Sequence, residues 1–451
     1  MAHSRPHPIA IASFTAALTA ILAGVLACAS AFAATAPQEQ QPLPAPSSSA
    51  QKLYSTAQND LLQIRVLLKN GRTQASVGSG FLVGDSNLVV TNYHVMSQIA
   101  LEPETYVGEY VDTANQRGPV ELLAVDALHD LAVVRVGRTG TGFFKVPEQI
   151  QQLPELTQGQ YLYSLGNPLD LGFAISEGSY NGIIRRGFYD QLMFTGPINA
   201  GMSGGPNVTT DGKVAGVNVS KRLDGELVSF LVPVRYVQEL LAKVRLQTRP
   251  AKDFSLIVGQ QLMAHQAVII DKLLESPLTL KSLGPYRVPV RESDQVRCWG
   301  QSNAKPDIPY TVDEMRCQTE SAIFVSGQLQ TGQVSIQHAY TRSTELNSLR
   351  FSELVSNAFK NQVSGSYKNA QVTAPACNEQ FVSNKKLPMR AVLCVRAYRK
   401  FTGLYDFILL TASADQSMMS LQSRIETKGV SYDNGLRVSR IFLDSLSKGG
   451  N

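Results

Sequence analysis

A serine stands among four glycines in residues 196–206, which read GPINAGMSGGP. Glycine permits backbone angles that other residues avoid, and it lets another chain segment approach closely. A loop of this composition can direct consecutive N–H groups toward one point while it exposes the hydroxyl of Ser203. A nucleophilic serine with an oxyanion hole requires this geometry, although a Gly/Ser turn without chemistry has the same composition.

Two residues upstream could supply a base and an acid that orients it. His94 follows an apolar run in LVVTNYHV, and Asp130 opens the run DLAVV. Taken alone, such a histidine is more often structural and such an aspartate is usually a turn residue. Together with Ser203 they form an ordered series, 36 and 73 residues apart, inside one β-rich section. The combination favours a catalytic triad over three unrelated residues.

The elements that must position these residues are predicted to be short strands. Between residues 51 and 247 the chain alternates β-like runs with turns rich in Gly, Asn, Asp and Pro; examples are LLQIRVLL, GSGFLVG, NLVVTN, DLAVVRV, YLYSLG and KVAGVNVS. Closely spaced strands indicate an all-β barrel or sandwich rather than βαβ units. A helix is expected to start at Pro233, and Asp253 is expected to cap a second helix that runs to about Leu274.

Residues 61–241 resemble the trypsin-like (chymotrypsin-fold) serine proteases and, among these, the bacterial Deg/HtrA type. The resemblance rests on TNYHV around His94, HDLAVV around Asp130 and INAGMSGGP around Ser203. GSGFLV and SLGNPLDLG add two further matches in the family's order. The resemblance implies an all-β double β-barrel, with the triad in the cleft between two six-stranded barrels.

The family mechanism then carries over residue by residue. Ser203 attacks the scissile carbonyl, His94 takes its proton as general base, and Asp130 holds the imidazole tautomer. The N–H groups of Gly201 and Ser203 are expected to form the oxyanion hole. His129, the neighbour of Asp130, is expected to be exposed and inert.

The substrate-binding residues are predicted from their place in the motif. Ile198 is expected to line the pocket for the residue whose carbonyl is attacked, and Val228 to face it. No acid stands at the base of this pocket, which predicts small or medium apolar side chains there rather than Lys or Arg. Met202 occupies the position before the serine where the Deg/HtrA type usually has Asn, and its effect on the oxyanion loop stays open.

The section from residue 253 to 451 has no recognisable family and no convincing PDZ domain, which Deg/HtrA proteins usually carry. It mixes β-like and helical runs, which predicts an α+β domain. It also contains Cys298, Cys317, Cys377 and Cys394. Two disulfides are expected, with the sequential pairing 298–317 and 377–394 favoured because both loops are short. A metal site is the rival interpretation, but the spacing lacks a C-x-x-C pair.

The N-terminus has the plan of a secretory signal peptide. Residues 1–33 join a start that contains Arg5, an apolar stretch and the site Ala31-Phe32-Ala33. An uncleaved anchor and lipidation of Cys28 are the alternatives. Residues 34–50 are rich in Pro, Ser and Gln, which predicts a disordered linker. We therefore expect a periplasmic or secreted protein without a stable membrane span after cleavage.

The composition excludes several functional classes. The chain of 451 residues has a net charge of +5, and 43% of its residues are hydrophobic. No Lys/Arg run suits a phosphate backbone, so nucleic acid is not an expected partner. No cofactor or metal is expected, the partners are protein or peptide substrates, and the resemblance raises the expectation of a homo-oligomer.

The predicted function is an exported serine endopeptidase in envelope protein quality control or processing. The alternative is a catalytically weak or silent protease-fold binding protein whose C-terminal domain does the recognition.

Overall fold

The computed structural model describes residues 47–149, 155–221, 227–247, 251–305, 307–363 and 370–449. The predicted signal peptide and most of the predicted linker lie outside these residues. Residues 46–451 form one compact unit. Helix α1 (Ser48–Ala57) begins inside the segment expected to be a disordered linker: Ser47 caps it, and Ala50 is fully buried. The last residues of that segment are therefore ordered, because Ala50 packs into a core that the local composition does not reveal.

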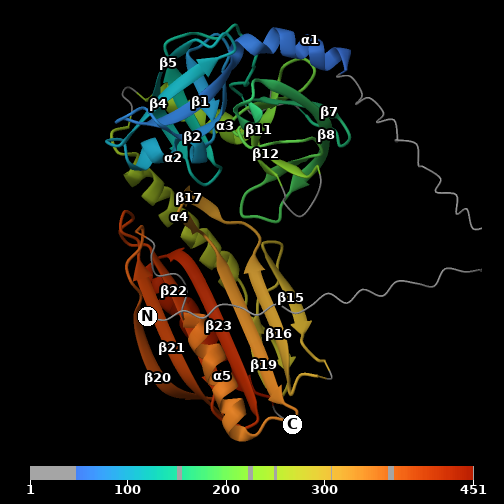
Figure 1. Ribbon diagram of the computed structural model, residues 1–451, viewed down its shortest axis with the longest axis vertical. Coiled ribbons are helices and arrows are strands. Elements are labelled where there is room, and N and C mark those ends of the chain that lie inside the picture. The colour runs from blue at the N-terminus through green and yellow to red at the C-terminus, as the bar shows by residue number, and fades with distance from the viewer. Residues whose placement is uncertain are drawn as a thin grey trace, which may run out of the picture. The chain divides into compact units, whose positions relative to one another are not determined.

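Two closed antiparallel barrels of six strands each follow α1 (Figure 1), so the predicted double barrel is confirmed. The first has the strand order β1-β2-β3-β6-β5-β4 and closes where β1 pairs with β4. The second has the order β10-β11-β12-β9-β8-β7 and closes where β10 pairs with β7. The first barrel consists of β1 (Leu61–Leu68), β2 (Gln74–Leu82), β3 (Leu88–Thr91), β4 (Tyr106–Asp112), β5 (Arg117–Asp126) and β6 (Leu131–Val136). The second consists of β7 (Tyr161–Gly166), β8 (Ala174–Ile184), β9 (Gln191–Phe194), β10 (Pro206–Val208), β11 (Val214–Lys221) and β12 (Ser229–Pro233).

Short helices connect the strands of the barrels. Helix α2 (Tyr93–Leu101) follows β3, and helix α3 (Val234–Leu246) follows β12 with Pro233 at its N-cap, as the sequence predicts. The 3-10 turns η1 (Gln58–Asp60) and η3 (Pro168–Asp170) lie before β1 and after β7.

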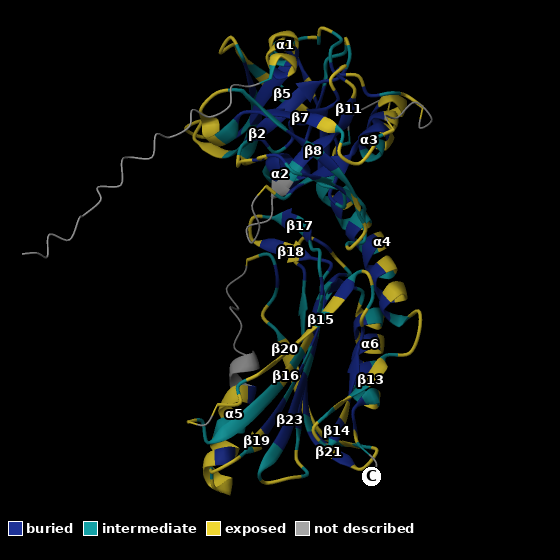
Figure 2. Cartoon of the chain, turned by 90° about the vertical axis from the view of Figure 1, so that its right-hand side faces the viewer, coloured by how far each residue is buried: buried dark blue, intermediate teal, exposed yellow. Residues whose placement is uncertain are grey.

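Helix α4 (Phe254–Leu274) joins the barrels to the C-terminal half. The side chain of Asp253 accepts a hydrogen bond from the N–H of Leu256, so the predicted cap is present. The first half of α4 buries Val258 and Leu262 in the core of the first barrel, whereas its second half buries Ile269, Ile270 and Leu273 in the core of the C-terminal sheet. Figure 2 shows these buried stretches along the helix. One helix thus contributes to both cores.

The C-terminal half is built on an open sheet of seven antiparallel strands with helices against it, so the predicted α+β class is confirmed. The strand order is β15-β16-β19-β23-β22-β21-β20. The sheet consists of β15 (Val296–Ser302), β16 (Tyr310–Thr319), β19 (Val334–Ser343), β20 (Ala376–Asn384), β21 (Leu387–Ala397), β22 (Tyr405–Ser413) and β23 (Met419–Val430). The other elements are α5 (Ser348–Val363), α6 (Tyr432–Ser445), the hairpin β17 (Ile323–Ser326) and β18 (Leu329–Thr331), and the small sheet of β13 (Thr279–Leu283), β14 (Tyr286–Val290) and β24 (Ser447–Lys448).

Both edges of the seven-stranded sheet carry a disulfide. Cys298 of edge strand β15 bonds to Cys317 of β16, and Cys377 of edge strand β20 bonds to Cys394 of β21. In each case the two cysteines are direct cross-strand partners, with Cα atoms 4.0 Å apart. This is the pairing favoured from the sequence, and it joins each edge strand covalently to its neighbour.

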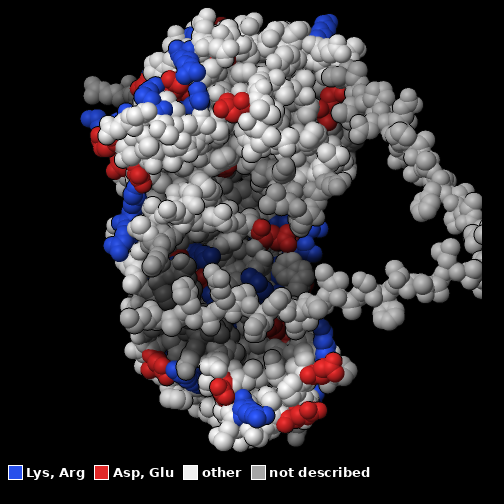
Figure 3. Space-filling model, in the orientation of Figure 1, with Lys and Arg blue, Asp and Glu red and all other residues white. Residues whose placement is uncertain are grey.

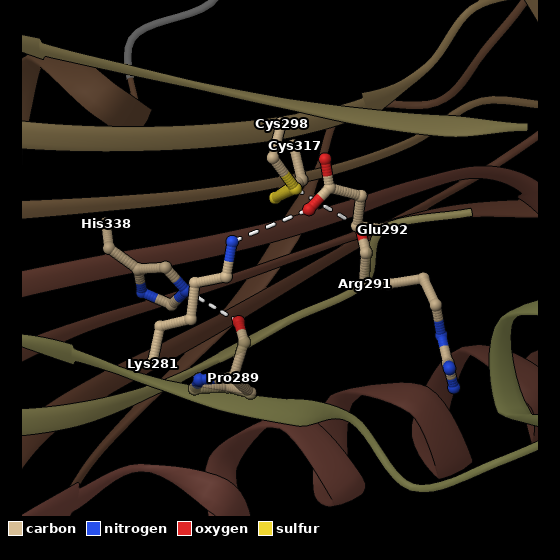
Figure 4. The surroundings of a disulfide bond; sticks show 7 residues. All are labelled: Lys281, Pro289, Arg291, Glu292, Cys298, Cys317 and His338. Atoms are coloured by element: carbon tan, nitrogen blue, oxygen red, sulfur yellow. Dashed lines mark hydrogen bonds and ion pairs between the residues drawn. A yellow bond between two sulfur atoms is a disulfide. The ribbon is translucent and has the colours of Figure 1, made fainter. Parts of the chain in front are cut away.

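Buried polar groups surround the first of these disulfides (Figure 4). The ring of His338 donates from Nε2 to the carbonyl of Pro289 at 2.7 Å, and its Nδ1 accepts from the hydroxyl of Ser423 at 2.8 Å. Arg291 is also buried, and its guanidinium donates to the carbonyls of Leu273 and Ser276 at the C-terminal end of α4. A cation there is favourable because the last carbonyls of a helix lack partners and carry partial negative charge.

On the face drawn in Figure 3, Lys and Arg side chains are interspersed with Asp and Glu. Among the described residues, no helix is both long and apolar enough to cross a membrane.

Candidate active site

His94 lies at the start of α2, one turn after the buried strand β3. Its neighbour Tyr93 is fully buried and fixes the first turn of the helix. The ring Nδ1 of His94 lies 2.7 Å from Oδ2 of Asp130, and its backbone N–H donates to Oδ1 of the same carboxylate at 2.7 Å. Two hydrogen bonds to one carboxylate therefore fix both the start of the helix and the orientation of the imidazole.

Asp130 holds this position with a backbone conformation that is uncommon among non-glycine residues. Its φ is +54°, in the left-handed region, and the side-chain amide of Asn92 donates to its carbonyl at 2.7 Å. Strained residues persist when surrounding contacts over-determine them, and they concentrate at functional sites.

Two opposing influences act on the pKa of His94. Burial opposes the imidazolium and is the largest single influence, but the charge of Asp130 and its hydrogen bond to the ring together outweigh it, so the pKa of His94 is raised above its ordinary value. A base of this kind accepts a proton more readily than a free histidine.

Ser203 lies in the loop between β9 and β10, which needs glycine at two positions. Gly201 and Gly204 have φ values of +91° and +85°. A Cβ on Gly204 would also lie 2.2 Å from the carbonyl oxygen of Ser79, which real Cβ contacts do not allow. The glycines therefore serve conformation and close approach, as the sequence predicts.

Ser79 of β2 attaches this loop to the first barrel. Its N–H donates to the carbonyl of Ser203 at 2.7 Å, and its hydroxyl donates to the carbonyl of Gly201 at 2.7 Å. Asn218 of β11 holds the other side: its amide donates to the carbonyls of Leu165 and Met202. Both side chains are fully buried. Neither was singled out from the sequence, and only the serine in the GSGFLV match gave any signal.

The Ser203 loop and the helix that bears His94 border the same glycine of β2. A Cβ on Gly78 would lie 3.0 Å from the carbonyl oxygen of Ser203 and 2.5 Å from a methyl of Val95 on α2. The hydroxyl of Ser203 lies 3.4 Å from the carbonyl oxygen of Val219. Within the described ranges no hydrogen bond links Ser203 to His94. Catalytic hydrogen bonds in unliganded sites are often long and tighten when substrate binds.

The two N–H groups expected to form the oxyanion hole are available. Among the described residues, neither Gly201 nor Ser203 donates its backbone N–H to an acceptor. Nearby loop groups are satisfied, because Met202 N–H donates to Asn199 and Gly205 N–H donates to Met202, both at 3.0 Å. Two free donors on a fixed loop are what an oxyanion requires.

Ile198 and Met202 lie in the core of the second barrel, where they are 3% and 2% exposed. Met202 therefore packs inward, away from the loop surface, and its carbonyl helps to anchor the loop. Val228 is half-buried just before β12. The substrate-binding roles of Ile198 and Val228 stay predictions.

His129 is not the exposed, inert residue expected from the sequence. Its Nδ1 lies 2.7 Å from Oδ2 of Asp126, and its ring stacks on Tyr236 with centroids 3.6 Å apart. Tyr189 packs on the same ring and bonds to His265 of α4 at 2.9 Å. The prediction of exposure is wrong because two partners of His129, Tyr189 and Tyr236, come from elements that are distant in the sequence. The ring supports the turn that presents Asp130.

Among the described residues there is no group of three or more His, Cys, Asp or Glu side chains that could hold a metal ion.

Residues 78–217 match the model of the trypsin-like peptidase domain. Similar curated proteins include serine protease HTRA1B of Danio rerio, 26% identical over 39% of this chain and 36% of the relative, and mitochondrial serine protease HTRA2 of Drosophila persimilis, 30% identical over 38% and 39%. The match thus spans little more than a third of these relatives. A serine endoprotease from Yersinia pestis is a similar solved structure, with a TM-score of 0.38 and 23% identity, covering 45% of this chain and 69% of that one. The predicted likeness to trypsin-like and HtrA serine proteases is confirmed for the barrel section.

Proposed function

We propose that this protein is a serine endopeptidase that cleaves polypeptides through an acyl-enzyme. The observation that carries the proposal is the double hydrogen bond between His94 and Asp130, beside a glycine-fixed loop that presents Ser203. The matching peptidase domain and the HTRA relatives support it.

The proposed reaction has two steps. The hydroxyl oxygen of Ser203 attacks the scissile carbonyl carbon while Nε2 of His94 accepts the hydroxyl proton. The resulting oxyanion accepts hydrogen bonds from the N–H groups of Gly201 and Ser203. The C–N bond then breaks as the imidazolium returns the proton to the leaving amine, which leaves Ser203 acylated. Water, deprotonated by His94, hydrolyses the ester and restores the serine.

The raised pKa of His94 sets the expected pH dependence. The imidazole must be neutral to accept the proton, so activity falls as the pH drops through its pKa. Because Asp130 raises that pKa, the midpoint should lie above the ordinary histidine value of about 6.5. Replacing the carboxylate should move the midpoint down.

We further propose export to the periplasm or exterior, a division at residues 51–247 and 253–451 into a protease and a recognition domain, and a role in envelope protein quality control or processing. The two disulfides support an oxidising compartment.

Casein cleavage by the purified chain tests the activity. The wild type should degrade unfolded casein, and Ser203→Ala should not. Ser55→Ala is the matched control, because that exposed hydroxyl on α1 bonds only to the carbonyl of Lys52. Equal cleavage by wild type and Ser203→Ala would overturn the proposal.

A catalytically silent binding protein is the second candidate. The observation that favours it is the Ser203 hydroxyl, which faces Val219 rather than His94. Such a protein would bind unfolded casein without cleaving it.

A further inference from the structure

A hairpin from the C-terminal half packs on the helix that carries His94. β17 contacts α2, and the two lie side by side in Figure 2. Ile323, Val325 and Leu329 of the hairpin are buried in the core of the first barrel. The hydroxyl of Tyr93 donates to the carbonyl of Val325 at 2.9 Å, across a sequence separation of 232 residues. The hairpin is therefore fixed to the residue that precedes His94.

Phe324 of this hairpin lies against the imidazole itself. The ring centroids of Phe324 and His94 are 6.0 Å apart, with the planes at 73°, which is an edge-to-face contact. Phe324 makes a similar contact with Tyr93 at 6.3 Å. Phe324 is only partly buried, and 29% of the His94 side chain remains exposed. The two rings therefore form adjoining parts of the same accessible surface.

A second contact fixes the C-terminal half to the Asp130 side of the site. The side-chain amide of Gln261 on α4 donates to the carbonyl of Val125 at 2.9 Å, and its oxygen accepts from the N–H of Ala127 at 2.9 Å. His265 of α4 adds the contact with Tyr189, which packs on His129. The C-terminal half thus holds both the helix that bears His94 and the turn that bears Asp130, so the place of Phe324 beside the triad is well defined.

We infer that Phe324 is a specificity-determining residue and forms a wall of the substrate cleft next to His94. The inference rests on the proposed function. A general base must reach both the nucleophile and the leaving group, so the polypeptide on either side of the scissile bond passes close to the imidazole. A phenyl ring at its edge occupies room that a side chain flanking the scissile bond would need. Small side chains at one flanking position are accepted, and bulky ones are disfavoured.

Cleavage of a peptide set tests the inference. The peptides share one scissile residue and carry Ala, Val, Leu or Phe at the positions flanking it. Phe324→Ala should reduce the preference of kcat/KM for Ala over Phe at one flanking position by about 10-fold or more, the range over which apolar pockets discriminate by size. Leu329→Ala is the matched control: its buried side chain lies on the same hairpin, so it should lower stability and leave the preference unchanged.

Binding of the same peptides in the Ser203→Ala background gives a second measurement that needs no turnover. Phe324→Ala should again narrow the difference in affinity between peptides with Ala and Phe at that position. A uniform fall in kcat with an unchanged preference would show that Phe324 only positions His94, and unchanged preferences in both assays would overturn the inference. A wild type that binds with the expected preference but cleaves nothing would contradict the proposed function alone.

Discussion

The barrels and the seven-stranded sheet differ in whether they contain strands with an unpaired backbone edge. Every strand of a closed barrel has two neighbours, so no backbone edge is left open, and residues 51–247 contain no cysteine. The open sheet has edge strands β15 and β20, and each is joined to its neighbour by one disulfide. The four disulfide-bonded cysteines therefore lie at the open edges of the sheet and not in the barrel section, which contains the proposed catalytic residues.

The proposed catalytic residues lie instead at the ends of barrel strands and in a barrel loop. His94 and Asp130 come from the ends of strands in one barrel, and Ser203 comes from a loop of the other. Contacts across the two barrels, such as Ser79 to Ser203, bring them together. Changes to the triad should therefore leave the sheet untouched, and changes to the disulfides should leave the triad working.

The largest effect is expected from Asp130→Asn. The amide favours the wrong tautomer of His94, and such a change costs about 10⁴-fold in kcat in serine proteases of this type. The midpoint of thermal unfolding should change little by comparison. Asp211→Asn, in the exposed turn between β10 and β11, is the control variant and should keep full activity. If the kcat of Asp130→Asn stayed within 10-fold of the wild-type value, the proposal that Asp130 orients a catalytic His94 would be wrong.

Acid is expected to lower the free energy of unfolding through two buried histidines, His265 of α4 and His338 of β19. Burial lowers the pKa of His338 and of His265 to about 4. Unfolded histidine takes up a proton below about pH 6.5, whereas these folded residues stay neutral, so their stability contribution is present above pH 6.5 and is lost as the pH falls toward 4. The loss is on the order of 3 kcal/mol for each group.

Urea unfolding between pH 7.5 and pH 4.5 measures this loss. His338→Gln should flatten the dependence on pH, even if it lowers the free energy of unfolding at neutral pH. A variant with the same slope as the wild type would show that His338 does not carry the effect.

A loss of stability of similar size is expected when one edge loses its disulfide. Cys377→Ala combined with Cys394→Ala should lower the free energy of unfolding by about 3 kcal/mol, the value for a loop of this length. The separation of 17 residues matches the 19 of the other pair, so Cys298→Ala with Cys317→Ala provides a comparison at the second edge. Casein cleavage in the absence of denaturant should persist. If the 377/394 variant were folded but cleaved no casein, the expectation that the barrels work without the edge disulfide would be contradicted.

Much of the local structure could be predicted from the sequence. The strands of the barrels, helices α3 and α4, the cap at Asp253 and the glycine loop all follow from short-range patterns. The residues that fix the site could not be predicted, because their contacts are long-range. Ser79 bonds to Gly201 across 122 residues, and Phe324 meets His94 across 230 residues, from a separate half of the chain. His129 was misjudged for the same reason, since no pattern near it indicates Tyr189 or Tyr236.

Labelling with a fluorophosphonate tests the central claim most directly, because the reagent bonds only to an activated serine. We expect one adduct per wild-type chain, located by peptide mass spectrometry at Ser203 and lost in His94→Ala. A folded wild type without an adduct, or with an adduct on another serine, would contradict the claim that Ser203, His94 and Asp130 form a working nucleophilic site.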